Sequence, residues 1–104
     1  MKFYFVYILL CADKSYYTGI TNNLEYRLIQ HQNGLASAYT AKRLPIRLEW
    51  HLQCTDPKDA IAIEKQLKGW SRKKKQALIE GKWEDLVKFS KNYSEYGNPK
   101  LDNL

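Results

Sequence analysis

The chain has 104 residues, which is enough for one domain with one modest hydrophobic core. Lys and Arg exceed Asp and Glu by six, so the surface suits either a polyanionic partner such as nucleic acid or solubility alone. The two cysteines lie far apart and exclude a disulfide framework, and no apolar run approaches the ~20 residues of a membrane span.

Two strands joined by a tight turn are predicted at the start of the chain. Residues 5–10 are apolar or aromatic at nearly every position, which is typical of a central strand covered on both faces. The turn residues 13–15 then predict a hairpin to a second strand over residues 16–21. Gly19 interrupts this strand, and such a glycine usually marks a bulge or a close approach to the backbone.

A helix follows the second strand, and an asparagine at its start can cap it. Leu24, Leu28 and His31 fall on one face of this helix, and Arg27 lies beside them at helical spacing. A cation and an imidazole therefore stand along the inward row, where leucines are expected. A glycine closes the helix, and residues 35–41 are expected to form a loop with a short second helix.

Alternating polarity predicts a third strand over residues 46–53. The apolar side chains expected to share one face of this strand are Ile46, Leu48, Trp50 and Leu52. A second long helix begins at Asp56, with Asp as its cap and Pro at its first helical position, and ends at Gly69. Glu64 lies within the apolar row of this helix, which Ala60, Ile63 and Leu67 otherwise form.

The last third of the chain is strongly basic before it becomes polar. Ser71 can cap a further helix, which starts with the basic residues 72–75 and ends at Gly81. Apolar residues at 83, 86 and 87 suggest a last short helix, and residues 91–104 are expected to form a loose polar tail. We therefore expect one domain over residues 1–90 and a C-terminal tail.

This order of elements predicts the α+β class. Strands that follow one another through short turns form an antiparallel sheet, and the helices must then cover its faces. The expected fold is a small three-stranded antiparallel sheet flanked by helices, in the order β-β-α-α-β-α with extra C-terminal helices.

Polar groups from separate elements stand where burial is expected. Arg27 and His31 lie on the first long helix, Glu64 on the second, and Tyr17 in the sheet. Because an unpaired buried charge is costly, several of them suggest a shared cleft. An alternative interpretation is a structural salt bridge between Arg27 and Glu64, with the tyrosines as plain core.

At these residues the chain resembles the GIY-YIG endonuclease domain, above all the small stand-alone bacterial members of that superfamily. The resemblance extends over about residues 2–86, and an ordered set of matches is more specific than either tripeptide alone. The matching residues, in chain order, are Tyr7, Tyr17, Gly19, Arg27, His31 and Glu64. Phe5 and Thr18 depart from the two tripeptides, and the lysine and the late asparagine of some family members have no clear match.

The resemblance implies hydrolysis of a phosphodiester bond with one divalent ion, Mg²⁺ or Mn²⁺, held by Glu64 largely through water. Arg27 is expected to donate parallel hydrogen bonds to the phosphate. Gly19 would leave room for the phosphate to approach the sheet.

The base that activates the water has two candidates. Tyr17 holds the family position of the base or its relay, although a free tyrosine loses its proton only near pH ~10 and would need nearby cations. His31 is the second candidate, since a neutral imidazole is available at pH 7. Tyr7 is expected to orient Tyr17 or the water.

A nucleic-acid-binding surface is expected around the basic residues. Its predicted members are Gly19, Thr40, Lys42, Arg43, Lys68, Trp70, Arg72 and Lys73. Tyr39 and Trp70 could stack on unpaired bases. The lysine-rich run has an alternative interpretation as a solvated helix face.

The function predicted from these residues is that of a metal-dependent endonuclease acting on nucleic acid, with DNA in repair or processing as the expected substrate. The alternative is a non-catalytic nucleic-acid-binding module of the same fold. Because the N-terminal residues lack the pattern of a signal peptide, we expect the protein in the cytoplasm. The sequence leaves a protein partner or a homo-oligomer open.

Overall fold

The computed structural model describes residues 2–82 of the chain. The elements of this part, in chain order, are β1 (Tyr4–Leu10), β2 (Tyr16–Thr21), α1 (Leu24–Gln32), α2 (Ala38–Ala41), β3 (Arg47–Cys54), α3 (Pro57–Lys68) and α4 (Arg72–Ile79). They fall into two compact units that divide after Gly69, so the sheet and α1 to α3 form the first unit and α4 belongs to the second. The predicted helix near residue 83 and the predicted tail lie outside the described residues, and the expectation of one domain over residues 1–90 stays a prediction.

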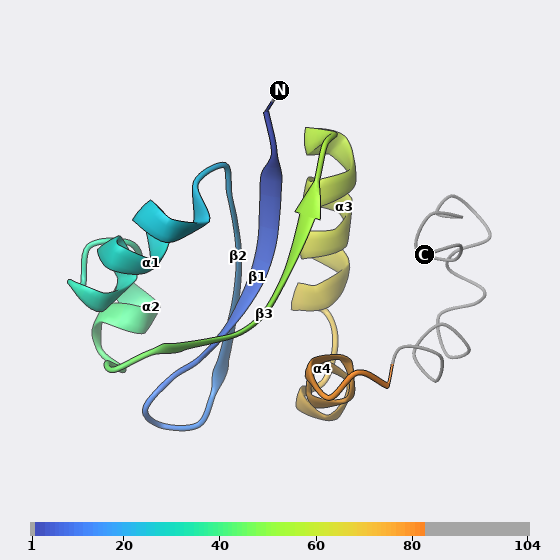
Figure 1. The fold of residues 1–104 in the computed structure, drawn as a ribbon. Coiled ribbons are helices and arrows are strands. Elements are labelled where there is room, and N and C mark those ends of the chain that lie inside the picture. Colours follow the sequence, from blue (N-terminus) through green and yellow to red (C-terminus); the bar gives the residue numbers. More distant parts are fainter. Residues whose placement is uncertain (1, 83–104) are drawn as a thin grey trace. The chain divides into compact units, whose positions relative to one another are not determined.

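β1 is the central strand of an antiparallel sheet with the strand order β2-β1-β3. Residues 6–9 of this strand are all buried, because helices cover both faces of the sheet (Figure 1). The predicted central strand is therefore confirmed. Successive side chains of a strand point to opposite faces, so Tyr7 and Leu9 face one helical layer while Val6 and Ile8 face the other.

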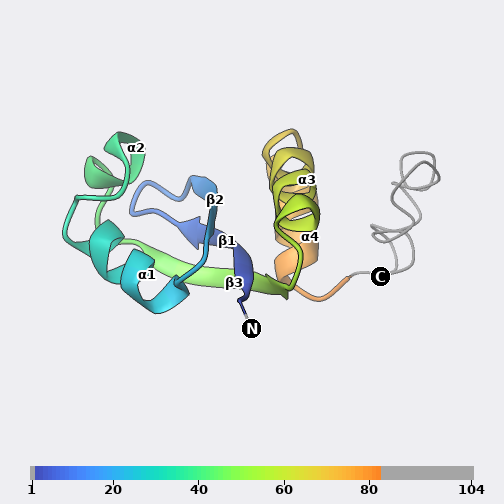
Figure 2. The same ribbon diagram turned by 90° about the horizontal axis from the view of Figure 1, so that it is seen from above.

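The first unit has three layers. Helices α1 and α2 lie on one side of the sheet and α3 lies on the other, as both views show (Figures 1 and 2). Leu24 and Leu28 of α1 pack against the buried cluster that contains Tyr7 and Leu9. α3 lies against β1 and β2 and buries the predicted apolar row, Ala60, Ile63 and Leu67. The α+β class and the three-stranded antiparallel sheet are both confirmed.

β3 contains one irregularity that the alternating sequence does not reveal. Its register against β1 passes from Ile8 opposite Trp50 to Leu9 opposite Leu48, so Glu49 is an extra residue without a partner on β1. Since Ile8 and Leu9 face opposite layers, Leu48 and Trp50 do so too. The prediction that these two side chains share one face is wrong, and Leu48 packs in the cluster on the α1 side.

Local caps fix both ends of α1. The side chain of Asn23 accepts a hydrogen bond from the backbone N–H of Tyr26 at 3.0 Å. At the other end Gly34 has a φ of +74°, and its N–H and that of the next residue donate to the carbonyls of His31 and Gln30. These bonds hold the last turn of α1, which carries His31.

The described part of the second unit contains α4. The hydroxyl of Ser71 accepts a hydrogen bond from the backbone N–H of Lys74 at 3.2 Å, which confirms the predicted cap. The ammonium of Lys74 lies 5.6 Å from the centre of the Trp70 ring. Every helix between residues 2 and 82 is too short or too polar to cross a membrane.

The register of β1 and β2 places Gly19 directly opposite Tyr7. A Cβ atom at position 19 would lie 2.5 Å from the Cζ of Tyr7 and would also collide with its hydroxyl. Because Tyr7 is 1% exposed, its ring has no open space into which it could move. We expect Gly19→Ala to lower the free energy of unfolding by about 1–3 kcal/mol, measured by urea denaturation.

Gly69→Ala is the matched control for this substitution. A Cβ there meets no atom closer than 3.6 Å, and the φ of Gly69 is −85°, which alanine adopts freely. We expect this control to change the free energy of unfolding by at most about 1 kcal/mol. A Gly19→Ala variant as stable as the wild type would show that the Tyr7 ring is not held against residue 19.

Candidate active site

The buried centre of the site is a hydrogen bond between Tyr7 on β1 and His31 on α1. Tyr7 Oη and His31 Nε2 are 2.9 Å apart, and the two residues are 1% and 0% exposed. On the far side of the imidazole, His31 Nδ1 lies 2.8 Å from Oγ1 of Thr40, which is in α2 and is also 0% exposed. Three elements therefore meet in one buried polar chain, which is strong in a low-dielectric interior.

His31 is held neutral by its surroundings. Burial, together with the positive charge of Arg27, lowers the pKa of His31 from 6.5 to about 4. The imidazole is therefore uncharged at pH 7, as a base requires. Because both of its nitrogens are hydrogen-bonded within the protein and the ring is fully buried, His31 reaches a substrate only through the hydroxyl of Tyr7.

Tyr17 lies on the same face of the sheet and is held by other rings. Its ring meets His31 edge to face, with 5.3 Å between the centroids, and stacks on Tyr39 at 5.9 Å and 29°. The guanidinium of Arg43 lies 3.7 Å from the centre of the Tyr39 ring. Tyr17 stays partly exposed, so it is the phenol of the site that solvent reaches.

The guanidinium of Arg27 influences the ionisation of both the phenol of Tyr7 and the imidazole of His31. Its Nη1 donates to Oε1 of Gln30 at 3.1 Å, while its buried Nε has no hydrogen-bond partner in the described part of the chain. Burial raises the pKa of Tyr7 above its usual value, and Arg27 opposes this rise as a hydrogen-bond donor and as a positive charge. The guanidinium thus acts on both Tyr7 and His31.

Glu64 approaches from α3, on the other side of the sheet. Its negative charge is one of the causes that raise the pKa of Tyr7, so the carboxylate lies close enough to act on that phenol. Its Oε2 is 3.0 Å from Nζ of Lys68, and its side chain is 15% exposed. Within residues 2–82 Glu64 pairs with Lys68, so the structural salt bridge between Arg27 and Glu64 considered from the sequence is not formed.

The donor set at Glu64 fits a hydrated divalent cation. Residues 2–82 contain no group of three His, Cys, Asp or Glu side chains that could enclose a metal ion. Mg²⁺ commonly keeps several water ligands and binds through only one or two carboxylates, which a single Glu64 can supply. Lys68 lies 3.0 Å from Oε2 of this carboxylate, so a metal at Glu64 would share the carboxylate with that ammonium or displace it.

Two of the residues predicted to touch nucleic acid are buried instead. Thr40 is 0% exposed and bonded to His31, so a direct contact with nucleic acid is closed to it in this structure. Gly19 packs against the phenol of Tyr7, where the sequence prediction placed an approaching phosphate. Both residues shape the buried half of the site.

The other residues predicted to bind nucleic acid differ in whether they already form ion pairs within the protein. Lys42 is exposed at the end of α2. Arg43 is paired with Asp13 at 2.9 Å, and Lys68 is paired with Glu64. The remaining three residues belong to the second unit. Trp70 is half-buried there, and Arg72 and Lys73 are exposed.

Residues 39–43 contain side chains that support Tyr17 and His31, a role that was not predicted from the sequence. Residues 39–43 combine an aromatic ring, a hydroxyl and two cations, a pattern that was assigned to nucleic-acid binding. In the structure Tyr39 stacks on Tyr17, Arg43 lies over the ring of Tyr39, and Thr40 is hydrogen-bonded to His31. Tyr39 contacts Tyr17 and Arg43 but is still 37% exposed, so base stacking by Tyr39 stays a prediction.

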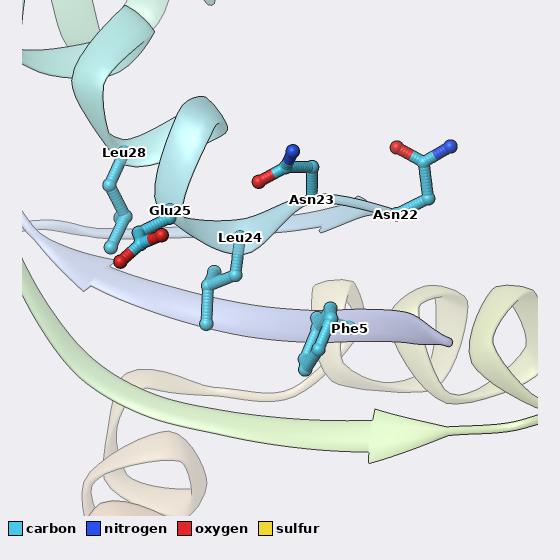
Figure 3. Close-up of a pocket in the computed structure, with 6 residues that line it drawn as sticks. All are labelled: Phe5, Asn22, Asn23, Leu24, Glu25 and Leu28. Carbon is cyan, nitrogen blue, oxygen red and sulfur yellow. The ribbon is translucent and has the colours of Figure 1, made fainter. Parts of the chain in front are cut away.

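A solvent-open groove of about 390 Å³ lies beside the start of α1 (Figure 3). Leu24 and Leu28 point from α1 toward the sheet, on which Phe5 of β1 lies. Its lining residues are Phe5, Asn22, Asn23, Leu24, Glu25 and Leu28. None of the five predicted catalytic residues is among them, so this groove is separate from the candidate active site.

The lowered pKa of His31 predicts how stability depends on pH. Between about pH 6.5 and pH 4 the unfolded chain binds a proton at His31 that the folded chain does not bind. The free energy of unfolding therefore rises with pH across this window. The contribution of His31 to it is lost as the pH falls. This residue alone should contribute about 2 kcal/mol of difference between about pH 4.5 and pH 7.

Urea denaturation of the wild type and of His31→Asn at both pH values measures this contribution. We expect the variant to lose most of the pH dependence over this window, whatever its absolute stability. His51→Asn is the control, because His51 is exposed on β3 and should leave the dependence intact. An unchanged dependence in His31→Asn would contradict a neutral buried imidazole.

Comparison with known proteins agrees with this geometry. The model of the GIY-YIG catalytic domain matches residues 3–77. A UPF0213 protein of Lacticaseibacillus paracasei is 40% identical over 79 residues, which are 76% of this chain and 89% of that protein. A UPF0213 protein of Clostridium perfringens is 41% identical over 78 residues, or 75% of this chain and 84% of that protein.

A solved structure is similar as well. The solution NMR structure of a UPF0213 protein from Bacillus halodurans has a TM-score of 0.51 and 36% sequence identity, and covers 75% of this chain and 83% of that one. The family predicted from the sequence is thereby confirmed. The chain belongs to the GIY-YIG catalytic domain family, and its relatives include small UPF0213 proteins.

Proposed function

We propose that this chain is a metal-dependent endonuclease that hydrolyses phosphodiester bonds in DNA, in repair or processing. The observation that supports this most is the meeting of four elements at one phenol. The positive charge of Arg27 on α1 lowers the pKa of Tyr7 on β1, whereas the carboxylate of Glu64 on α3 and an ionised Tyr17 on β2 raise it. A carboxylate, a guanidinium and phenols around one point are suited to phosphoryl chemistry.

Glu64 and Arg27 would supply the charges that the reaction needs. A divalent cation on Glu64, when bound, polarises the phosphate and stabilises the leaving oxygen. Arg27 carries five N–H donors, of which Gln30 takes one, so its guanidinium keeps donors for non-bridging phosphate oxygens. These donors stabilise the charge that builds up in the transition state.

Tyr17 is our choice for the group that takes a proton from the attacking water or relays it. It is partly exposed, while Tyr7 and His31 are buried. Rings on two sides hold its phenol in one place, which keeps the reacting geometry constant. His31 acts on the site through Tyr7.

A non-catalytic nucleic-acid-binding module is the second candidate function. The ion pair between Glu64 and Lys68 favours it, because the carboxylate already has a cation and needs no metal for neutralisation. The net charge of +6 supports nucleic-acid binding under either function. The two functions differ only in whether the bound strand is cut.

Cleavage of labelled DNA substrates with Mg²⁺ or Mn²⁺ separates the two functions. We expect Glu64→Gln to lower the cleavage rate by about 100-fold or more, because the metal loses its protein ligand. Glu49→Gln is the matched control, since Glu49 is also ion-paired and 19% exposed but lies on β3 outside the site. Salt-dependent binding without cleavage of any substrate would favour the binding module.

Tyr17→Phe tests the assignment of the base. Loss of the hydroxyl alone should lower the cleavage rate by about 100- to 10,000-fold while the ring contacts with His31 and Tyr39 persist. Tyr26→Phe is the control, because Tyr26 is 58% exposed on α1. Cleavage by Tyr17→Phe at the wild-type rate would move the role of the base to another group.

A further inference from the structure

The buried polar chain of the site ends on a group that can only accept hydrogen bonds. Thr40 Oγ1 lies 3.3 Å from the backbone carbonyl oxygen of Ser37, one turn back in the same short helical segment. A carbonyl has lone pairs and no hydrogen, so the hydroxyl of Thr40 is the donor in this bond. The one hydrogen of Thr40 Oγ1 is thereby used.

The hydrogen bond from Thr40 to Ser37 sets the donor and the acceptor in the other two hydrogen bonds of this buried polar chain. With its hydrogen on Ser37, Thr40 Oγ1 can only accept at its 2.8 Å contact with His31 Nδ1, so Nδ1 carries the proton. A neutral imidazole has a single N–H, and Nε2 is then a bare acceptor. The hydroxyl of Tyr7 must donate to Nε2 across 2.9 Å.

We propose that Thr40 is a positioning residue that fixes His31 in the Nδ1–H tautomer and thereby aims the hydroxyl hydrogen of Tyr7 away from the reaction centre. The assignment of the tautomer stands on the three distances and on the burial of all three side chains. Its consequence for catalysis rests on the proposed function.

The direction of the hydroxyl hydrogen of Tyr7 determines whether the phenol oxygen can accept a hydrogen bond from Arg27. With its hydrogen on His31, the phenol oxygen keeps its lone pairs available to the Arg27 guanidinium, which opposes the rise in the pKa of Tyr7 that burial causes. In the opposite tautomer Nε2–H would donate to Tyr7, and the phenol hydrogen would then point toward Arg27. Thr40 therefore acts on Arg27 indirectly, through His31 and the hydroxyl of Tyr7.

Nitrogen spectra of the histidine side chains test the tautomer directly. The chain has only two histidines, so ¹⁵N-labelled protein gives long-range ¹H–¹⁵N correlations from His31 and from the exposed His51, which serves as the internal reference. We expect wild-type His31 at pH 7 to show a protonated Nδ1 and a bare Nε2. A wild-type spectrum with the proton on Nε2 would overturn the proposal, even if no variant folded.

Two substitutions then separate positioning from packing. Thr40→Val keeps the shape but removes the acceptor, so His31 should lose the pure Nδ1–H pattern. Thr40→Ser keeps the hydroxyl and should keep that pattern, although it removes a buried methyl group. The same Nδ1–H pattern in Thr40→Val as in the wild type would show that Thr40 does not set the tautomer.

The catalytic consequence has its own readout. We expect Thr40→Val to lower the cleavage rate by about 10- to 100-fold and Thr40→Ser to restore most of it. Wild-type cleavage by a Thr40→Val variant whose tautomer has changed would overturn the link to catalysis. If the wild type cleaves no substrate, the proposed function fails, while the spectra still decide the tautomer.

Discussion

The structure depends on how the phenol of Tyr7 is buried. This side chain sits at the middle of the central strand, 1% exposed, and its hydroxyl would cost several kcal/mol if it had no partner. Two neighbours allow the side chain to be buried, one by leaving space for the ring and one by bonding to the hydroxyl. Gly19 on β2 leaves the space that the ring fills, and His31 on α1 forms a hydrogen bond with the hydroxyl. One residue therefore ties the hairpin to the helical layer.

This constraint divides the candidate site into two halves. Tyr7, His31 and Thr40 form a buried half, in which each polar group is bonded to the next. Tyr17 and the two charged residues of the site keep partial exposure, so they form the half that solvent reaches. A rigid buried support under exposed reactive groups is what preorganised catalysis needs.

Much of this arrangement could be predicted from the sequence, because it follows from periodicity. The apolar run of β1 predicts a central strand, and the helical spacing that places His31 and Glu64 among apolar residues predicts that they face inward. The prediction that His31 lies on the inward face is confirmed by its complete burial. The range matched by the GIY-YIG family model, residues 3–77, includes both residues.

Other features could not be predicted, because they depend on contacts distant in sequence. The extra residue Glu49 on β3 is invisible in a pattern that alternates cleanly on both sides of it. The bond between Thr40 and His31 depends on how α2 folds back on α1. The pairing of Lys68 with Glu64 is different, because it is a local i,i+4 pair on α3 and its spacing is visible in the sequence. Sequence identifies the polar residues of this site, and tertiary contacts determine their partners.

The coupling between Tyr7 and His31 is the most direct test of this account. A double-mutant cycle with Tyr7→Phe, His31→Leu and the double variant, measured as free energies of unfolding, isolates the bond between the two side chains. The account predicts a coupling energy of about 1–2 kcal/mol, as expected for a buried hydrogen bond. Additive effects within about 0.3 kcal/mol would contradict it, because the two residues would then contribute to the fold independently.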